Sequence, residues 1–164
     1  MKYLFYISLF IFPLTSCFSK HDTSRQIPSI KILLTDSAST FSTQFIKEGT
    51  PTILAFFDPD CDHCKEMTAD LINNMNFFKS INIIYLTTNQ SLFESRAFYQ
   101  YYHLSQYPNI HYGIDTAFKF LKFFQPHSTP YIAIYDKDKD LRFTFDGGTS
   151  VSNMEIFLKK LSNE

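Results

Sequence analysis

A buried strand that passes into an amphipathic helix across two closely spaced cysteines constrains the fold more than any other segment. Residues 52–57 (TILAFF) form a continuous apolar run, long enough for a buried central strand and too short for a core helix. After Cys61, apolar residues recur at helical spacing as far as Phe78. We therefore predict that the strand leads directly into a helix, with Cys61 and Cys64 in its first turn.

The rest of the chain continues to alternate between strand and helix patterns. Ser91 and Glu94 fit a capping box at the start of the second helix. In chain order we expect a hairpin beginning near residue 29, the first strand and helix, a strand at 82–87, a helix at 91–104, a strand at 109–114, a helix at 116–124, a hairpin at 131–135 and 141–145, and a helix at 152–161. This order predicts an α/β fold of three layers, with a central mixed sheet flanked by helices and an N-terminal β-hairpin extension.

The N-terminal residues have the order of a signal peptide. Lys2 precedes an apolar run over 3–14, and small residues follow before Cys17. The run is shorter than the roughly 20 apolar residues that span a bilayer. Leu14-Thr15-Ser16-Cys17 resembles the lipobox of bacterial lipoproteins, which implies that Cys17 becomes lipid-modified and anchors the chain to a membrane. The alternative is an ordinary secretory signal that leaves Cys17 as a free thiol.

These features divide the chain into a signal peptide over 1–16, a polar tether over 17–28 and one domain over 29–164. A chain of 164 residues suits a single domain, and its 45% hydrophobic content is typical of a packed core. Its 15 basic and 16 acidic residues nearly cancel, and no dense Lys/Arg stripe is present. A nucleic-acid partner is therefore excluded from the expected functions.

The spacing Cys61-Asp62-His63-Cys64 places two thiols one helical turn apart. A structural disulfide that closes so short a loop would stabilise the fold by only about 2 kcal/mol. Reversible redox chemistry therefore explains the pair better. Cys64 lies on the apolar stripe and should be shielded, whereas Cys61 begins the helix, where free N–H groups favour a thiolate. We therefore predict that Cys61 attacks and that Cys64 resolves.

The segment PTILAFFDPDCDHCKEM resembles the exported TlpA/ResA-like branch of the thioredoxin superfamily, and residues 128–134 (STPYIAI) match its cis-proline segment. The resemblance implies a thioredoxin-like fold and a cis Pro130 that faces the Cys61 sulfur. It also implies that the Thr129 backbone pairs with an extended substrate segment. The expected activity is protein-disulfide exchange through Cys61 and Cys64, without a metal or an organic cofactor.

The expected partners are protein thiol or disulfide substrates, a redox-recycling protein and, through the lipid, a membrane. The expected location is the bacterial cell envelope, facing the periplasm. An exported protein meets oxidising conditions, in which a close cysteine pair is either a bridge or a redox centre.

Two departures from the family pattern bear on the direction of electron flow. Ala55 stands where many thioredoxins carry a buried acid, and Asp62-His63 replaces Gly-Pro between the cysteines. Three acids, Asp58, Asp60 and Asp62, surround Cys61 and oppose its thiolate, unless they serve simply to cap the helix. We therefore predict a mildly lowered Cys61 pKa, tuned by Asp62 and His63, which favours a reductant or isomerase over a strong oxidant.

Two alternative functions remain open from the sequence. A thioredoxin-like copper carrier would combine the cysteines with a distant histidine, and His103, His111 and His127 are the candidates. A non-catalytic binding module would use the aromatic run at 98–102 as a partner surface, although helical spacing makes that run fit a core with a polar flank better.

Overall fold

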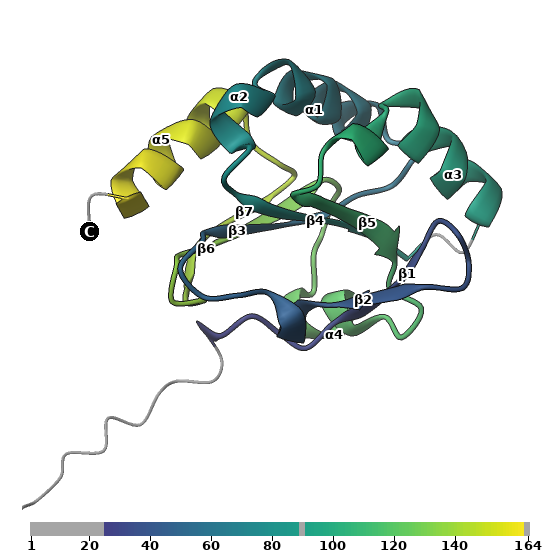
Figure 1. Ribbon diagram of the computed structural model, residues 1–164, viewed down its shortest axis with the longest axis horizontal. Helices are drawn as coiled ribbons and strands as arrows, with labels where there is room; N and C mark the ends of the chain where they lie inside the picture. The colour runs from purple at the N-terminus through teal and green to yellow at the C-terminus, as the bar shows by residue number, and fades with distance from the viewer. Residues whose placement is uncertain (1–24, 89–90, 163–164) are drawn as a thin grey trace, which may run out of the picture.

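The computed structural model describes residues 25–88 and 91–162. These residues form one seven-stranded sheet in the order β2-β1-β5-β4-β3-β6-β7 (Figure 1). The neighbours β3, β4 and β5 are parallel, and the other pairs are antiparallel. The strands are β1 (Lys31–Leu34), β2 (Thr40–Ser42), β3 (Thr52–Phe56), β4 (Asn82–Thr87), β5 (Ile110–Ile114), β6 (Tyr131–Tyr135) and β7 (Leu141–Asp146).

Helices cover both faces of this sheet, which confirms the predicted three layers. Figure 1 shows α1, α2, α3 and α5 on one face and α4 on the other. The helices are α1 (Asp62–Asn73), α2 (Met75–Phe78), α3 (Leu92–Tyr101), α4 (Lys119–Phe124) and α5 (Val151–Ser162), with 3-10 turns η2 (Thr43–Phe45) and η3 (Leu104–Gln106). The β1–β2 pair is the predicted N-terminal hairpin.

The central strand β3 is buried on both faces, as its continuous apolar run predicts. Ile53 and Ala55 belong to the core beneath α1, α3 and α5. Leu54 and Phe56 point to the opposite face and belong to the core that contains Phe120 of α4. The chain leaves β3 at the same end at which β6 begins, because Phe56 is paired with Tyr131. This register brings the cysteine segment and the Thr129-Pro130 segment together.

The predicted helix from Cys61 to Phe78 is interrupted, which corrects the expectation of one continuous element. Asn74 leaves helical geometry at φ −106° and ψ 16°, and α2 starts after it. Its side-chain Nδ2 donates to the Asp70 carbonyl at 2.8 Å, and asparagine commonly competes with helix hydrogen bonds in this way. The apolar spacing continues through Met75 and Phe78 because both still face the core.

Helix α4 begins at Lys119 rather than at residue 116, because Phe118 has a left-handed backbone with φ 54°. Helix α3 ends at Tyr101, and a left-handed His103 with φ 50° separates it from η3. At its other end, the Ser91 hydroxyl accepts the Glu94 N–H at 3.3 Å, which is half of the predicted capping box.

The first described residues lie against the turn between β6 and β7. Arg25 donates to the Leu141 carbonyl at 3.1 Å, and the Gln26 amide donates to Asp140 at 2.6 Å. Contacts with the domain thus begin before Ser29. The predicted signal peptide, Cys17 and most of the predicted tether lie outside the described residues. Within the described ranges, no helix is long and apolar enough to cross a membrane.

Candidate functional site

The two cysteines occupy the first turn of α1 but differ in environment. Cys61 is the N-cap residue and is partly exposed, whereas Cys64 is 0% exposed. The Cys64 side chain packs in the same core as Met67 and Leu71, as the apolar spacing predicts. Both cysteines are free thiols in this structure. The pair therefore presents one sulfur to a partner and shields the other.

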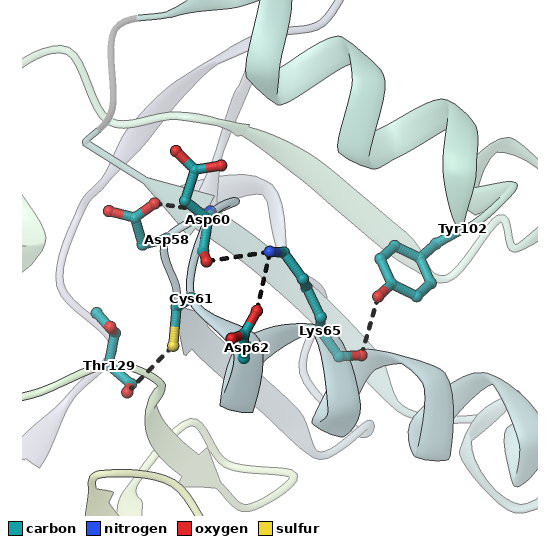
Figure 2. A network of polar contacts seen from close by, with 7 residues as sticks. All are labelled: Asp58, Asp60, Cys61, Asp62, Lys65, Tyr102 and Thr129. Atoms are coloured by element: carbon teal, nitrogen blue, oxygen red, sulfur yellow. Dashed lines mark hydrogen bonds and ion pairs between the residues drawn. The ribbon is translucent and has the colours of Figure 1, made fainter.

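The segment around residue 130 completes the site. The Thr129-Pro130 peptide bond is cis. The Cys61 thiol donates to the Thr129 carbonyl at 3.6 Å (Figure 2). His63 and Pro130 also line a hollow of about 300 Å³ between α1 and the start of α5. The structure thus brings together five residues that the sequence analysis selected: Cys61, Cys64, His63, Thr129 and Pro130.

Polar contacts at the start of α1 order the loop before Cys61 (Figure 2). The Asp60 N–H donates to the Asp58 carboxylate at 2.9 Å. Lys65 donates to the Asp60 carbonyl and to the Asp62 carboxylate, each at 3.1 Å. The Tyr102 hydroxyl donates to the Lys65 carbonyl at 3.1 Å and joins α3 to this turn.

The sequence prediction missed Lys65, because only the three acids were considered as charges near Cys61. The i, i+3 spacing of Asp62 and Lys65 was the available signal. The Asp62 side chain is 88% exposed, so the ion pair adds little to stability. It nevertheless places a positive charge beside one of the three acids that the sequence prediction considered.

The two thiols have pKa values shifted in opposite directions. Burial raises the pKa of Cys61, but hydrogen bonds from the thiol and N–H of Cys64 act against burial. The Thr129 side chain and the His63 N–H lower it further, and the pKa of Cys61 lies below its ordinary 9.0. Burial, followed by the contact with Cys61, raises the pKa of Cys64 to about 12. The direction predicted for Cys61 is confirmed, and Cys61 is the thiol that ionises first.

The interior beside Cys64 contains hydroxyl groups. Ala55 lies in the same core as Cys64, so a methyl group stands where many thioredoxins have an acid. The Thr68 hydroxyl donates to the Cys64 carbonyl at 2.8 Å and lies 3.2 Å from the Tyr85 hydroxyl. Thr68 and Tyr85 carry no signal of a site in the sequence, because each occupies an ordinary core position of its element.

The three candidate copper histidines are on separate elements. His103 follows α3, His111 stacks on Phe41 with ring centroids 3.7 Å apart, and His127 lies 2.8 Å from Asp146. Among residues 25–88 and 91–162, no group of three His, Cys, Asp or Glu side chains could hold a metal ion. The geometry of the described part gives the copper alternative no support.

The aromatic run of α3 is divided between the core and the surface. Phe98 is buried, Tyr99 and Tyr102 are half-buried, and Tyr101 is 77% exposed. Tyr101 and Tyr102 line a groove of about 520 Å³ that extends to Pro59 and Asp60. The run therefore contributes Phe98 to the core and leaves Tyr101 on the surface, which is the division between core and polar flank that helical spacing indicates.

Solved structures with the same fold include several redox proteins. One is the exposed lipoprotein thioredoxin Etrx1 of Streptococcus pneumoniae, with a TM-score of 0.63 and 19% identity over 81% of this chain and 99% of that one. Another is a secreted Mycobacterium tuberculosis disulfide oxidoreductase homologous to E. coli DsbE, with a TM-score of 0.64 and 15% identity over 83% and 96%. A third is M. tuberculosis DsbF, with a TM-score of 0.67 and 15% identity over 84% and 96%.

At these identities the likeness concerns the fold alone. No match was found among curated proteins. A family model described as a thioredoxin-like domain matches residues 42–162, which include the cysteine pair and the cis-proline segment. This match spans more than half of the sequence and agrees with the sheet and helix arrangement, so the chain belongs to the thioredoxin-like domain family.

Proposed function

We propose that the chain is a thiol-disulfide oxidoreductase of the exported TlpA/ResA-like type, acting on protein disulfides. One observation carries this proposal. A partly exposed Cys61 with a lowered pKa stands one helical turn from a buried Cys64 whose pKa is about 12. This asymmetry suits a pair in which one sulfur attacks and the other resolves.

The reaction follows from that difference. The Cys61 thiolate attacks one sulfur of a substrate disulfide, and the other substrate sulfur leaves as a thiolate that takes up a proton. Cys64 then loses its proton and attacks Cys61, which releases the second substrate thiol and leaves a Cys61–Cys64 disulfide. Two electrons pass from the protein to the substrate. A dithiol recycling protein returns them by the same exchange in reverse.

The charges around Cys61 favour a reductant or isomerase over a strong oxidant. A strong oxidant needs a highly stabilised thiolate. Asp58, Asp60 and Asp62 lie within three residues of Cys61 in the sequence, where negative charges act against a thiolate, and Lys65 offsets the charge of Asp62. Asp62 therefore acts as a tuning residue that limits the lowering of the Cys61 pKa, and His63 acts as one through its N–H, which lowers that pKa.

The proposed location is the bacterial cell envelope, with the domain held to a membrane by a lipid on Cys17 and facing the periplasm. The lipobox-like tetrad and the similarity to an exposed lipoprotein and a secreted oxidoreductase support this location. Arg25 and Gln26 contact the β6–β7 turn, whereas Pro130 precedes the opposite end of β6. A lipid N-terminal to Arg25 would thus attach to the chain at the end of the hairpin that is remote from Pro130.

Replacing Cys64 with serine should trap substrates on Cys61. Without the resolving thiol, the mixed disulfide persists, because its normal exit is attack by Cys64. Incubation with a cell-envelope extract, followed by non-reducing electrophoresis, should show adducts that dithiothreitol removes. The Cys61→Ser/Cys64→Ser double variant is the matched control and should show none. If the single variant forms no more adducts than the double variant, the proposed activity is wrong.

The alkylation of Cys61 should have a midpoint below pH 9 in the reduced protein. Iodoacetamide reacts with the thiolate, and the pKa of Cys61 lies below its ordinary 9.0. Tandem mass spectrometry, which fragments the peptides, distinguishes Cys61 from Cys64 within their shared tryptic peptide and from Cys17, and follows each rate from pH 4 to pH 11. Cys64 should remain unreactive in the neutral range, because its pKa is about 12. A midpoint below about pH 5 would contradict the mild tuning proposed here.

A further inference from the structure

Asp146, the last residue of β7, binds the loop that carries Thr129. Its carboxylate accepts the His127 N–H at 2.9 Å and the Ser128 N–H at 2.9 Å. It also accepts the Ser128 hydroxyl at 3.1 Å and lies 2.8 Å from the His127 ring Nδ1. One side chain thus fixes two successive residues immediately before Thr129 and Pro130.

The carboxylate is ionised in this arrangement. The backbone and side chain of His127 lower the pKa of Asp146 most, burial opposes them, and Ser128 lowers it further, to about 2. Hydrogen bonds to a charged acceptor are about twice as strong as those between neutral groups. Asp146 therefore holds the loop with its full negative charge at neutral pH.

The two glycines after Asp146 pack closely against the same loop. Gly148 has φ +83°, and a Cβ there would lie 2.7 Å from Pro130 Cγ. A Cβ on Gly147, with φ +90°, would lie 3.2 Å from the Ser128 hydroxyl. Asp146 itself pairs with Tyr131 across the β6–β7 ladder. The end of β7 and the 127–130 loop thus form one packed unit beside Cys61.

We propose that Asp146 is a positioning residue for thiol exchange, which holds His127 and Ser128 so that Thr129 stays against the Cys61 sulfur. The inference rests on the proposed function, because it assigns Asp146 a part in that reaction. Thr129 touches Cys61 through its carbonyl at 3.6 Å. Its side chain also contributes to the lowered pKa of Cys61. A loop released from Asp146 would move both groups.

Asp136 provides a matched control, because it performs the same structural task at the other end of the hairpin. Its carboxylate accepts the Asp138 N–H at 3.0 Å and the Asp140 N–H at 2.9 Å, and it pairs with Arg142 at 3.0 Å. Asp136 follows the end of β6 that is remote from Pro130. Asp136→Asn therefore loosens a turn of the same hairpin without touching the 127–130 loop.

The test compares Asp146→Asn and Asp136→Asn with the parent full-length chain in detergent. Asparagine keeps one of the two acceptor oxygens of the carboxylate. Its NH₂ group replaces the other oxygen and faces the donors whose hydrogen bonds that oxygen accepted. In Asp146→Asn the rate of insulin-disulfide reduction should fall about tenfold or more, because displacements near 1 Å cost up to about 100-fold. The midpoint of Cys61 alkylation should also shift, because both Thr129 groups that face the Cys61 sulfur move. Asp136→Asn should lower thermal stability and leave the rate and the midpoint unchanged.

Equal rates and equal alkylation midpoints in the two folded variants would overturn the positioning role. Ser128→Ala is a milder variant that removes one hydrogen bond and should lower the rate about threefold, consistent with the worth of one such bond. If Asp146→Asn does not fold, Ser128→Ala provides the test in its place. An unchanged rate in Ser128→Ala then overturns the proposal. An inactive parent chain would instead refute the proposed function itself, so the two failures are distinguishable.

Discussion

Cys61→Ser should lower the rate of insulin-disulfide reduction by about 1,000-fold or more, because the variant lacks the attacking sulfur. Serine has nearly the same shape, so the partly exposed N-cap position of α1 accepts it with little change in the fold. A serine at an N-cap is in fact favourable for a helix. The loss of rate therefore reflects the missing thiol and not unfolding of the variant. Far-UV circular dichroism checks that the variant is folded.

Cys17→Ser is the matched control for that loss. Cys17 is the remaining cysteine of the chain and is separated from the cysteine pair by more than 40 residues. Its replacement should leave the rate of the purified protein unchanged. A Cys61→Ser protein that keeps a tenth or more of the parent rate would exclude Cys61 as the nucleophile.

Phe57→Ala should lower the free energy of unfolding by about 3–5 kcal/mol, the usual cost of emptying a buried aromatic site. Phe57 is 0% exposed and packs against Tyr85, Phe98 and Tyr112, with ring centroids 5.4, 4.9 and 5.3 Å away. The cost is a large part of the roughly 5–15 kcal/mol that stabilises a domain. Urea denaturation followed by circular dichroism measures the change.

Phe93→Ala is the control for the loss of an aromatic ring as such. Phe93 lies on α3 and is 82% exposed, so its removal should change the free energy of unfolding by no more than about 0.5 kcal/mol. Phe57 also directly precedes Asp58, where the loop to Cys61 begins. Equal effects of the two substitutions would contradict the packing of Phe57 against β4, α3 and β5.

The sequence allowed the prediction of the cysteine site because its signals are local. A continuous apolar strand, a change to helical spacing and the two cysteines lie within one segment, and their side-chain pattern places Cys64 inside and Cys61 at the helix start. The break at Asn74 was missed for a physical reason. Apolar spacing records which side chains face the core, and this face continues across the interruption of the backbone.

The contacts of Asp146 could not be predicted in the same way. Two of its four partner groups are the backbone N–H groups of His127 and Ser128, which any residue other than proline would supply. They reach Asp146 only because β6 and β7 pair in a particular register. The cis bond before Pro130 was likewise expected from the family resemblance and not from the dipeptide, since only about one X-Pro bond in twenty is cis.

The most direct test of the account is equilibration of the full-length chain with glutathione buffers of increasing oxidising strength, followed by alkylation and peptide mass spectrometry. We predict one reversible transition, in which the single tryptic peptide that contains both Cys61 and Cys64 loses two hydrogen atoms and takes up no alkyl group, and which dithiothreitol reverses. If the two cysteines remain separate thiols in fully oxidised glutathione, or if their bond resists dithiothreitol in the folded protein, the account is contradicted.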